Sequence, residues 1–542
     1  MGKRRAVWRL GAPGAVLAIV LAVSLHFCLW KSGMFIDEIY SYGLSNSHYM
    51  PFIGGGGQED HDRLPEQVIT REEFFDYLAV TEGEPGFDVG SVYYNQVRDV
   101  HPPLYYWILN FCSTLARGQF SKWIGLVPGL VIYLGLVATV YALGAELYGD
   151  RWIAGAMALL YGLSQVGLST MLMIRMYGLM TLETVLLAWL TARELREPSR
   201  RRELGIGLTV YVGLMTQYYF VFYACFLCAA ALLALLLRRE RRAALRFALC
   251  ALAGVGLMLL CFPAVFTQMT GHRLGPESDA LANLKNLGAW VGRLRYYFGQ
   301  IRVGIPGAVL VTVGALAAAG IERAACPAAR GAAGPAGAVL QRVLVLLLPV
   351  VPTVFVPAVI SPVLEGRYIY NIMPICMLAP GFALWLCKRM GMRGAGAKGA
   401  ERKNLLRGLC LAAGALALVL ALRSVPDYIY DEHREYNGIV AEHAGAPCVY
   451  LTGYYAGITQ DMLQLMAFDE VYVTEDAGSR GLRDYLDGKG AGELVVYIDT
   501  DSMWGSGLDP RRELEALEEH TGYREAEHLY QYALSDTYLM RR

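Results

Sequence analysis

Apolar runs of about 20 residues recur along this chain, and they restrict it to one class of fold. Of its 542 residues, 55% are hydrophobic and only 18% are charged, which is too apolar a composition for a single soluble domain. Backbone polar groups find no water inside a bilayer, so segments that cross it fold as helices. The sequence therefore predicts a polytopic α-helical membrane protein.

The apolar runs predict about eleven membrane-spanning helices. The first run, residues 13–30, follows a basic N-terminus and ends in His26 to Trp30 rather than in the small residues of a cleavage site. We interpret it as an uncleaved helix. The other spans are expected at residues 123–145, 152–172, 176–192, 204–217, 219–237, 246–268, 303–321, 339–360, 368–387 and 405–422.

Basic loops give the orientation, because Lys and Arg accumulate on the cytoplasmic side. The three most basic loops, residues 193–202, 238–242 and 388–407, all fall inside when these spans alternate. Residues 104–116 are too short to cross, since about 13 residues of helix cover only ~20 Å of a ~30 Å core. We interpret them as an interfacial or half-inserted helix. The expected location is the cytoplasmic (inner) membrane.

Two domains are predicted. Residues 1–422 form a transmembrane domain that includes a long first outer loop, 31–122, and residues 423–542 form an extracytoplasmic α/β domain. Strands are expected there at 447–452, 470–474 and 493–499, with a strand pair within 523–540, and a short capped helix is expected after Thr70 in the outer loop. No glycine-rich phosphate loop, disulfide framework or zinc spacing is present. The net charge is zero, and no nucleic-acid partner is expected.

Polar motifs gather on the non-cytoplasmic side of this threading, which indicates an active site there. The motifs are Asp37-Glu38, Asp99-Val-His101-Pro102-Pro-Leu-Tyr105, Arg175-Met-Tyr177, the turn at Gln217, and Glu365-Gly-Arg367-Tyr368.

The acidic and histidine motifs suit proton transfer and anion binding. Asp37 could accept the proton of an attacking hydroxyl, although acids are also common at a helix end exposed to water. Asp99 and His101 precede the helix expected at 104–116, whose N-terminus favours an anion. A histidine with a purely structural role is the alternative.

The arginines suit phosphate. Arg175 lies at an outer turn, and its guanidinium can bind a lipid phosphate with bidentate geometry. The alternative is a snorkelling side chain at a helix end. Arg367 repeats this situation, with an internal ion pair to Glu365 as its alternative.

Together these motifs resemble the GT-C superfamily of membrane glycosyltransferases, of the protein O-mannosyltransferase and aminoarabinose-transferase type (glycosyltransferase family 39-like). The resemblance runs over most of residues 14–387. Asp37-Glu38 is similar to the acidic motif of the family's first outer loop, and Asp99 to Tyr106 to its His-Pro-Pro-Leu-Tyr-Tyr signature. Arg175 to Tyr177 is similar to an arginine-tyrosine motif. Gln217 stands where a Thr-His-Tyr-Tyr-like turn has its histidine.

The resemblance implies an inverting glycosyltransferase that moves a sugar from a polyprenyl-phosphate donor to an acceptor hydroxyl of a protein or surface glycan, in contact with membrane lipids. Asp37 would be the general base, and Glu38 would orient the acceptor or a cation. The residues expected at the donor phosphate are His101, Arg175, Tyr177, Arg367 and Tyr368. No cofactor is certain. A divalent cation, Mg²⁺ or Mn²⁺, bridging acids and phosphate stays open, and so does every metal ligand.

Two other classes of protein stay open at this point. A transporter or lipid flippase would show broken helices, midplane charges or inverted repeats, whereas the ionisable residues here fall near the outer ends of the spans. A ligand-binding membrane receptor would leave the acidic and His-Pro-Pro motifs without a purpose. The sequence identifies neither the sugar nor the acceptor.

Overall fold

A computed structural model describes residues 2–54, 64–270, 283–325, 334–361, 363–391, 398–502 and 505–542. The chain divides into two compact units. The helical unit comprises Met1–Leu29, Val100–Tyr105 and Leu126–Asp427, and the mixed unit comprises Trp30–Asp99, Tyr106–Gly125 and Tyr428–Arg542. The sequence predicted that the whole loop 31–122 belongs with the membrane domain. The structure groups most of this loop with the C-terminal residues instead.

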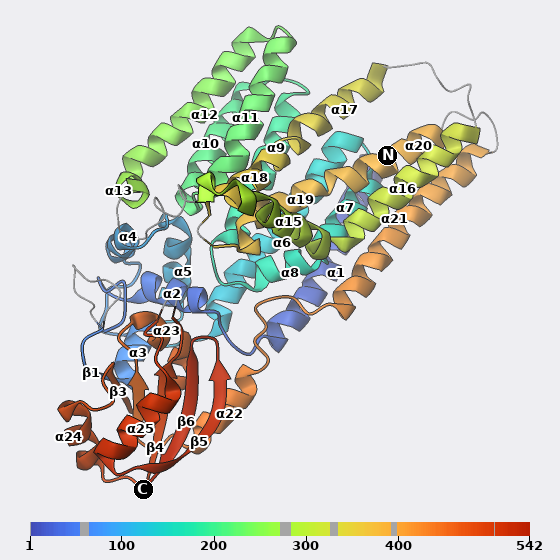
Figure 1. Cartoon of the computed structure of the whole chain (residues 1–542). Helices are drawn as coiled ribbons and strands as arrows, with labels where there is room; N and C mark the ends of the chain where they lie inside the picture. The colour runs from blue at the N-terminus through green and yellow to red at the C-terminus, as the bar shows by residue number, and fades with distance from the viewer. Residues whose placement is uncertain are drawn as a thin grey trace. The chain divides into compact units, whose positions relative to one another are not determined.

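The helical unit is built from long apolar helices, most of which begin or end within a few residues of the predicted spans (Figure 1). Their bounds are α1 (Gly2–Trp30), α6 (Lys122–Tyr148), α7 (Arg151–Gly162), α8 (Gln165–Leu172), α9 (Tyr177–Glu194), α10 (Arg200–Thr216), α11 (Phe220–Leu237), α12 (Arg241–Cys261), α13 (Val265–Thr270), α15 (Leu287–Gly304), α16 (Pro306–Ala325), α17 (Gly334–Leu347), α18 (Val350–Ile360), η3 (Gly366–Ile372), α19 (Met373–Cys376), α20 (Leu378–Gly391) and α21 (Lys398–Arg423).

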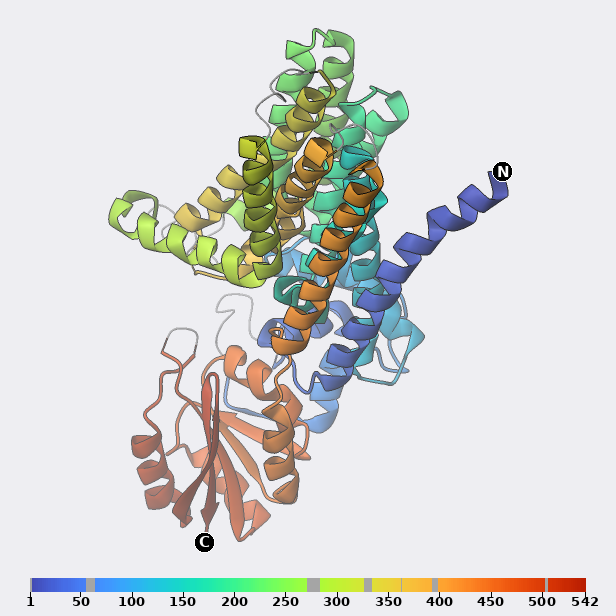
Figure 2. The same cartoon turned by 90° about the vertical axis from the view of Figure 1, so that its right-hand side faces the viewer.

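The described residues contain seven segments long and apolar enough to cross a membrane, or up to nine if each of two bent helix pairs counts as one span. The fold class is thus confirmed as a polytopic membrane protein, while the predicted number of about eleven is not. The bends are 60° between α7 and α8 and 83° between α15 and α16, and Figure 2 shows the second in yellow-green. Pro306 opens α16 and has no N–H to continue α15. Ser164 opens α8, accepting a hydrogen bond from the Gly167 N–H at 3.1 Å.

Close helix contacts in this unit depend on glycine. A Cβ on Gly207 of α10 would lie 2.4 Å from the carbonyl oxygen of Cys250, and one on Gly254 of α12 would lie 2.3 Å from the carbonyl oxygen of Gly207. Only small residues let two helix backbones approach so closely inside a membrane. The contact is completed by Glu203 and Arg246, which form a two-pronged ion pair at 2.7 and 2.8 Å. α10 and α12 therefore pack as a fixed pair.

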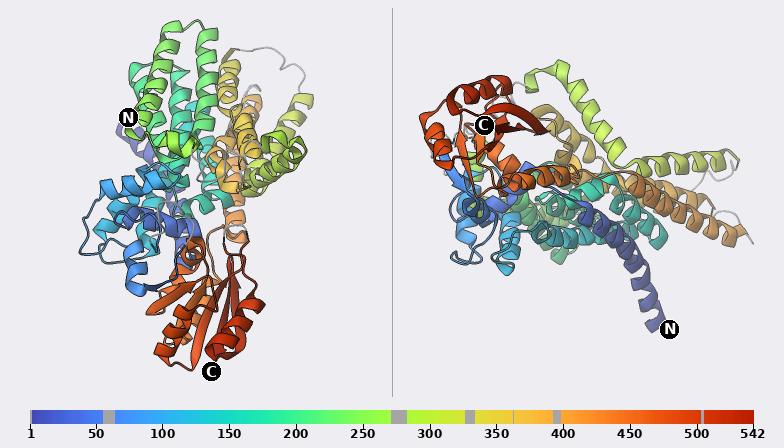
Figure 3. Two further views of the ribbon diagram at one scale, coloured as in Figure 1. Left: turned by 60° about the vertical axis from the view of Figure 1, so that its left-hand side comes forward. Right: turned by 90° about the horizontal axis from the view of Figure 1, so that it is seen from below.

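The mixed unit is built on one six-stranded sheet, of which Figure 3 shows the C-terminal strands in orange and red. The order is β1-β3-β2-β4-β6-β5; β2 runs parallel to β3 and β4, and the other pairs are antiparallel. The bounds are β1 (Gln67–Thr70), β2 (Cys448–Leu451), β3 (Glu470–Thr474), β4 (Glu493–Asp499), β5 (Arg524–Tyr532), β6 (Ser535–Arg541), α2 (Ile36–Asn46), α3 (Arg71–Leu78), α4 (Val89–Arg98), α5 (Leu104–Leu115), α22 (His433–Glu442), α23 (Tyr455–Leu465), α24 (Arg480–Lys489) and α25 (Pro510–Thr521).

The predicted α/β fold of the C-terminal residues is confirmed, strand by strand. The helix after Thr70 is confirmed too, since the Thr70 hydroxyl accepts from the Glu73 N–H and the Glu73 carboxylate accepts from the Thr70 N–H at 2.8 Å. The sequence did not predict β1, which pairs antiparallel with β3 over four residues. A strand of the first loop thus becomes an edge of the C-terminal sheet.

The two faces of the sheet differ in chemistry. One face carries an apolar core that includes Val449, Val496 and Leu517. The other buries polar side chains: Tyr450 stacks on its cross-strand neighbour Tyr497 at 5.4 Å between ring centroids. The Tyr450 hydroxyl donates to Asp461 at 2.7 Å, and the Ser535 hydroxyl donates to the same carboxylate at 2.6 Å. This layer therefore encloses a carboxyl group within the fold.

Burial of Asp461 predicts a stability that depends on pH. Desolvation raises the pKa of its carboxyl from 3.8 to about 7 despite the two hydroxyl donors. The folded state therefore binds this proton more tightly than the unfolded state, so its stabilising contribution is complete below pH ~4 and is lost as pH rises to ~7. Asp461→Asn removes this loss. We expect the free energy of unfolding of the Asp461→Asn variant to exceed that of the wild type by an amount that grows between pH 4 and 7. The growth is up to about 4 kcal/mol, at about 1.4 kcal/mol per pH unit.

Thermal unfolding of both proteins in the same detergent, at pH 4.5, 6 and 8, measures this difference. The comparison matters because His433 acts in the opposite direction: burial first, and then nearby Lys31, lower the pKa of its imidazole from 6.5 to about 4. Its contribution is present above pH ~6.5 and is lost towards pH 4. Both proteins contain His433, so its effect cancels. An advantage that does not change with pH would contradict the prediction.

Candidate active site

The acidic motif begins helix α2 of the mixed unit. Phe35 is the N-cap residue, with extended backbone at φ −73° and ψ 151°, and Asp37 and Glu38 lie in the first turn. The Glu38 carboxylate accepts from the Phe35 N–H at 2.7 Å and pairs with the Lys31 ammonium at 3.0 Å. Glu38 is fully buried, whereas Asp37 is half-buried. Acidic side chains are common in the first turn of a helix, where the helix dipole is positive.

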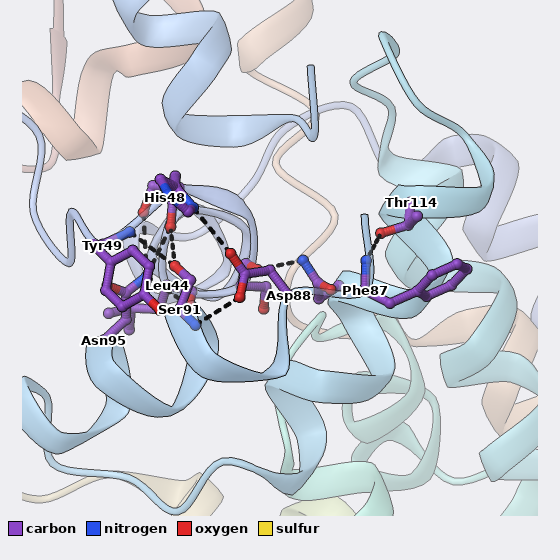
Figure 4. A network of polar contacts seen from close by, with 11 residues as sticks. Leu44, His48, Tyr49, Phe87, Asp88, Ser91, Asn95 and Thr114 are labelled. Carbon is purple, nitrogen blue, oxygen red and sulfur yellow. Dashed lines mark hydrogen bonds and ion pairs between the residues drawn. The ribbon is translucent and has the colours of Figure 1, made fainter. Parts of the chain in front are cut away.

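The opposite end of α2 is held by a polar network within the mixed unit (Figure 4). The Asn95 side-chain amide donates to the Ser47 carbonyl at 2.9 Å, and the Ser91 hydroxyl donates to the same carbonyl at 3.0 Å. Asp88 caps α4 by accepting from the Ser91 N–H at 2.9 Å, and its other oxygen lies 2.9 Å from the His48 ring. These contacts join the end of α2 to α4, so the helix that carries the acidic motif is fixed at both ends.

The His-Pro-Pro motif lies where the two units meet in the sequence. Asp99 ends α4 in the mixed unit, with its N–H bonded to the Asn95 carbonyl at 3.0 Å. His101, Pro102 and Tyr105 belong to the helical unit. Pro102 and Tyr105 are buried, and His101 is half-buried. The predicted helix after the prolines is present as α5, since prolines before a helix remove amide donors that would have no partner there.

Arg175 lies at a break between two helices of the helical unit. α8 ends at Leu172 and α9 begins at Tyr177, and the Arg175 N–H closes a tight turn onto the Met173 carbonyl at 2.8 Å. The Arg175 side chain is only 6% exposed and Tyr177 only 3%. A buried guanidinium is costly unless an anion or several acceptors surround it. The sequence predicted Arg175 at an outer turn, and the turn is present.

A stack of two tyrosines lies beside Arg367. The rings of Tyr219 and Tyr368 are parallel within 13°, with centroids 4.5 Å apart. The Arg367 guanidinium lies 5.9 Å from the Tyr368 ring, and its Nη2 is 3.9 Å from the Glu365 carboxylate. The Tyr219 hydroxyl is 2.9 Å from the Ser361 hydroxyl. The ion pair to Glu365 is therefore present, but it is too long to be a hydrogen bond.

The helical unit brings some of its predicted site residues together. α9, which begins at Tyr177, packs against η3, which holds Arg367 and Tyr368. Gln217 is buried, but its side-chain oxygen accepts the N–H of Tyr218 at 2.6 Å, so it stabilises its own turn.

Sequence reasoning missed three contributors. Lys31 was placed only at the start of the first outer loop, and neither Tyr219 nor Arg293 was predicted to have a role in the site. Arg293 donates to the Ala358 carbonyl at 2.6 Å and also to the Ser361 carbonyl, which closes the end of α18. For Lys31, the adjacent Ser32-Gly33 was the available signal. A helix that ends near these residues leaves Lys31 close to the acidic motif that follows in the sequence.

Among the residues described, no three His, Cys, Asp or Glu side chains lie close enough together to hold a metal ion.

Comparison with known proteins supports one superfamily. Residues 100–266 match the family model of dolichyl-phosphate-mannose-protein mannosyltransferases. A search of curated proteins by sequence gave no match.

Solved structures of glycosyltransferases share the fold. The apo crystal structure of ArnT from Cupriavidus metallidurans superposes with a TM-score of 0.52 at 11% identity, covering 99% of this chain and 98% of that one. ArnT bound to undecaprenyl phosphate gives 0.49 at 11% identity, with 98% of each chain covered. An oligosaccharyltransferase from Archaeoglobus fulgidus gives 0.44 at 10% identity, covering 96% of this chain and 72% of that one. The fold shared with the apo ArnT structure and the family match over residues 100–266 agree with the resemblance to the GT-C superfamily that the motifs indicated.

The tyrosine stack predicts a measurable coupling. Tyr219→Ala and Tyr368→Ala each remove one ring of a pair worth about 0.5–1.5 kcal/mol beyond its buried area. We expect the double variant to be destabilised by less than the sum of the single variants, by about 1 kcal/mol. Thermal unfolding of the four proteins in one detergent measures this, with Tyr538→Ala as a control for loss of an aromatic ring elsewhere. Strict additivity would contradict the stacking geometry.

Proposed function

We propose that this protein is an inverting glycosyltransferase that moves a sugar from a polyprenyl-phosphate donor to an acceptor hydroxyl of a protein or surface glycan. We further propose that the reaction takes place on the non-cytoplasmic face of the cytoplasmic membrane. The distribution of basic loops supports this orientation. The family that matches residues 100–266 is named for a dolichyl-phosphate-mannose donor, which supports the donor class.

The observation that carries the proposal is the pair of buried arginines in the helical unit. Arg175 is 6% exposed and the Arg367 side chain 11% exposed. Arg175 lies between α8 and α9, and Arg367 lies in the short 3₁₀ helix η3. Fixed cations of low exposure suit an anion that arrives from the membrane, because the interaction is strong where water is excluded. A departing lipid phosphate is such an anion.

Each residue then has a chemical task. Arg175 and Arg367 stabilise the negative charge that develops on the lipid phosphate as the glycosidic bond breaks. Tyr177 and Tyr368 form the walls beside these cations, and His101 contacts the same phosphate. Asp37 takes the proton of the acceptor hydroxyl as its oxygen attacks the anomeric carbon from the opposite side. Attack from that side inverts the anomeric configuration.

The test is transfer of labelled sugar by purified protein in lipid vesicles, with a panel of polyprenyl-phosphate sugars as donors. Asp37→Asn keeps the shape of the side chain and removes the base, so kcat should fall about 10²–10⁴-fold. Arg175→Ala should lower kcat/KM about 10²–10³-fold, because the leaving phosphate loses a donor of positive charge. Product NMR should show the anomeric configuration opposite to that of the donor.

Matched controls are Asp469→Asn and Arg480→Ala, whose side chains are 91% and 89% exposed on the mixed unit. Both should transfer sugar at the wild-type rate. A folded wild-type protein that neither binds nor turns over any donor of the panel would refute the proposal. Transport of a donor across the vesicle membrane without transfer would instead indicate a flippase.

A further inference from the structure

Lys31 directly follows α1 and precedes the acidic motif in the sequence, and its side chain is fully enclosed. Its ammonium donates to the Glu38 carboxylate at 3.0 Å and to the Tyr428 carbonyl at 2.6 Å. The Tyr430 ring lies 5.5 Å from the same ammonium. The side chains of Lys31 and Glu38 both have an exposed fraction of zero. A charged pair without water depends on such surrounding acceptors and donors.

The acceptors come from a C-terminal segment that runs along residues 30–33. The Ser32 N–H donates to the Ile429 carbonyl at 2.8 Å. The Arg434 guanidinium donates to the Ser32 hydroxyl at 2.7 Å and to the Trp30 carbonyl at 2.9 Å. The Trp30 indole N–H in turn donates to Asp431 at 3.0 Å. The segment that precedes α2 is therefore held in place by the first residues of the C-terminal half of the mixed unit.

Gly33 shows how close this approach is. A Cβ at Gly33 would lie 2.5 Å from two ring atoms of His433 and 2.8 Å from Cβ of Tyr430. No other residue fits without moving the segment. Lys31 consequently has a single path on which its ammonium reaches both the Tyr428 carbonyl and Glu38.

The contacts of Glu38 connect Lys31 to the first turn of α2. One of its carboxylate oxygens accepts from both Lys31 and the Phe35 N–H, at 3.0 and 2.7 Å. Asp37 precedes Glu38 directly, so its backbone direction is set by the same turn. The sequence predicted that Glu38 orients the acceptor or a cation; its buried contacts favour a role in orienting Asp37.

We propose that Lys31 is a positioning residue of the transfer reaction: it fixes the Glu38 side chain against the Phe35 N–H and thereby sets the direction of Asp37, with the C-terminal segment 428–434 as its support. This inference rests on the proposed function of Asp37 as the base. It assigns the C-terminal half of the mixed unit to the support of the acidic motif rather than to acceptor binding.

The experiment compares Lys31→Met, Glu38→Gln and the double variant in the sugar-transfer assay. Each single variant leaves one buried charge without its partner, so kcat should fall at least about 10-fold, while KM for the donor stays within about 2-fold. The double variant contains neither charge, and its loss should be no greater than that of the worse single variant. Lys489→Met is the matched control, since Lys489 pairs with Glu470 at 2.6 Å but is 42% exposed; it should keep the wild-type kcat.

Rescue by a conservative variant separates positioning from loss of structure. Lys31→Arg, which keeps the charge, should retain more activity than Lys31→Met. Losses that multiply in the double variant, or a single variant with wild-type kcat, would overturn the proposal.

Hydrogen exchange gives an outcome that does not depend on transfer. Amides in the first turns of α2, residues 36–42, should lose protection in the double variant, and those of α24 should not change. Unchanged protection of α2 would overturn the positioning role even if no donor of the panel is turned over. Loss of protection in a protein that shows no transfer would support the positioning and place the failure in the proposed reaction. If the single variants do not fold, the double variant and Lys31→Arg decide the same questions.

Discussion

The ion pair between Lys31 and Glu38 is the contact on which the arrangement of the mixed unit depends. Both charges are withdrawn from water, and a buried charge that loses its partner costs about 3–5 kcal/mol. The Phe35 N–H and the Tyr428 carbonyl add hydrogen bonds that stabilise the pair. Lys31 and Tyr428 are 397 positions apart in the sequence. The acidic motif and the C-terminal half of the unit are therefore parts of one folded body.

The helical unit places its polar side chains in a different way. Its apolar helices satisfy their own backbone groups, so the polar side chains gather where helices break: Arg175 between α8 and α9, and Arg367 in η3. A break leaves backbone groups and space that an uninterrupted helix does not offer. The Tyr219–Tyr368 stack fills such a space with large rings that lose little conformational entropy. These arginines are thus located at the irregular parts of an otherwise regular unit.

Elements that depend on local sequence signals could be predicted, whereas features that depend on contacts between residues far apart in the sequence could not. Apolar length and β-branched runs are local signals, so most helices of the helical unit and the strands β2 to β6 were predicted within a few residues. The bend at Ser164 was missed because the apolar composition continues through it. The bend at Pro306 was missed because most of α15, which contains three arginines, lies outside the predicted spans. β1 and Lys31 were missed for another reason. Gln67–Thr70 becomes a strand only beside β3, and Lys31 does not differ from any other lysine beside a span until Tyr428 is placed next to it. The motif residues were found because their types are rare in apolar surroundings, whereas Tyr219 is one of 34 tyrosines.

The pairing of β1 with β3 has a consequence for how the protein is made. β1 leaves the ribosome about 400 residues before its partner, with all the helices from α6 to α21 in between. Chains are synthesised from the N-terminus, and a contact between such distant segments forms late. The first loop must therefore stay without its sheet while the membrane helices are inserted, and its exposed strand edge is available to other chains during that time. The acidic motif is completed last, so a chain that stops before residue 428 carries the arginines of the site without the support of its acids.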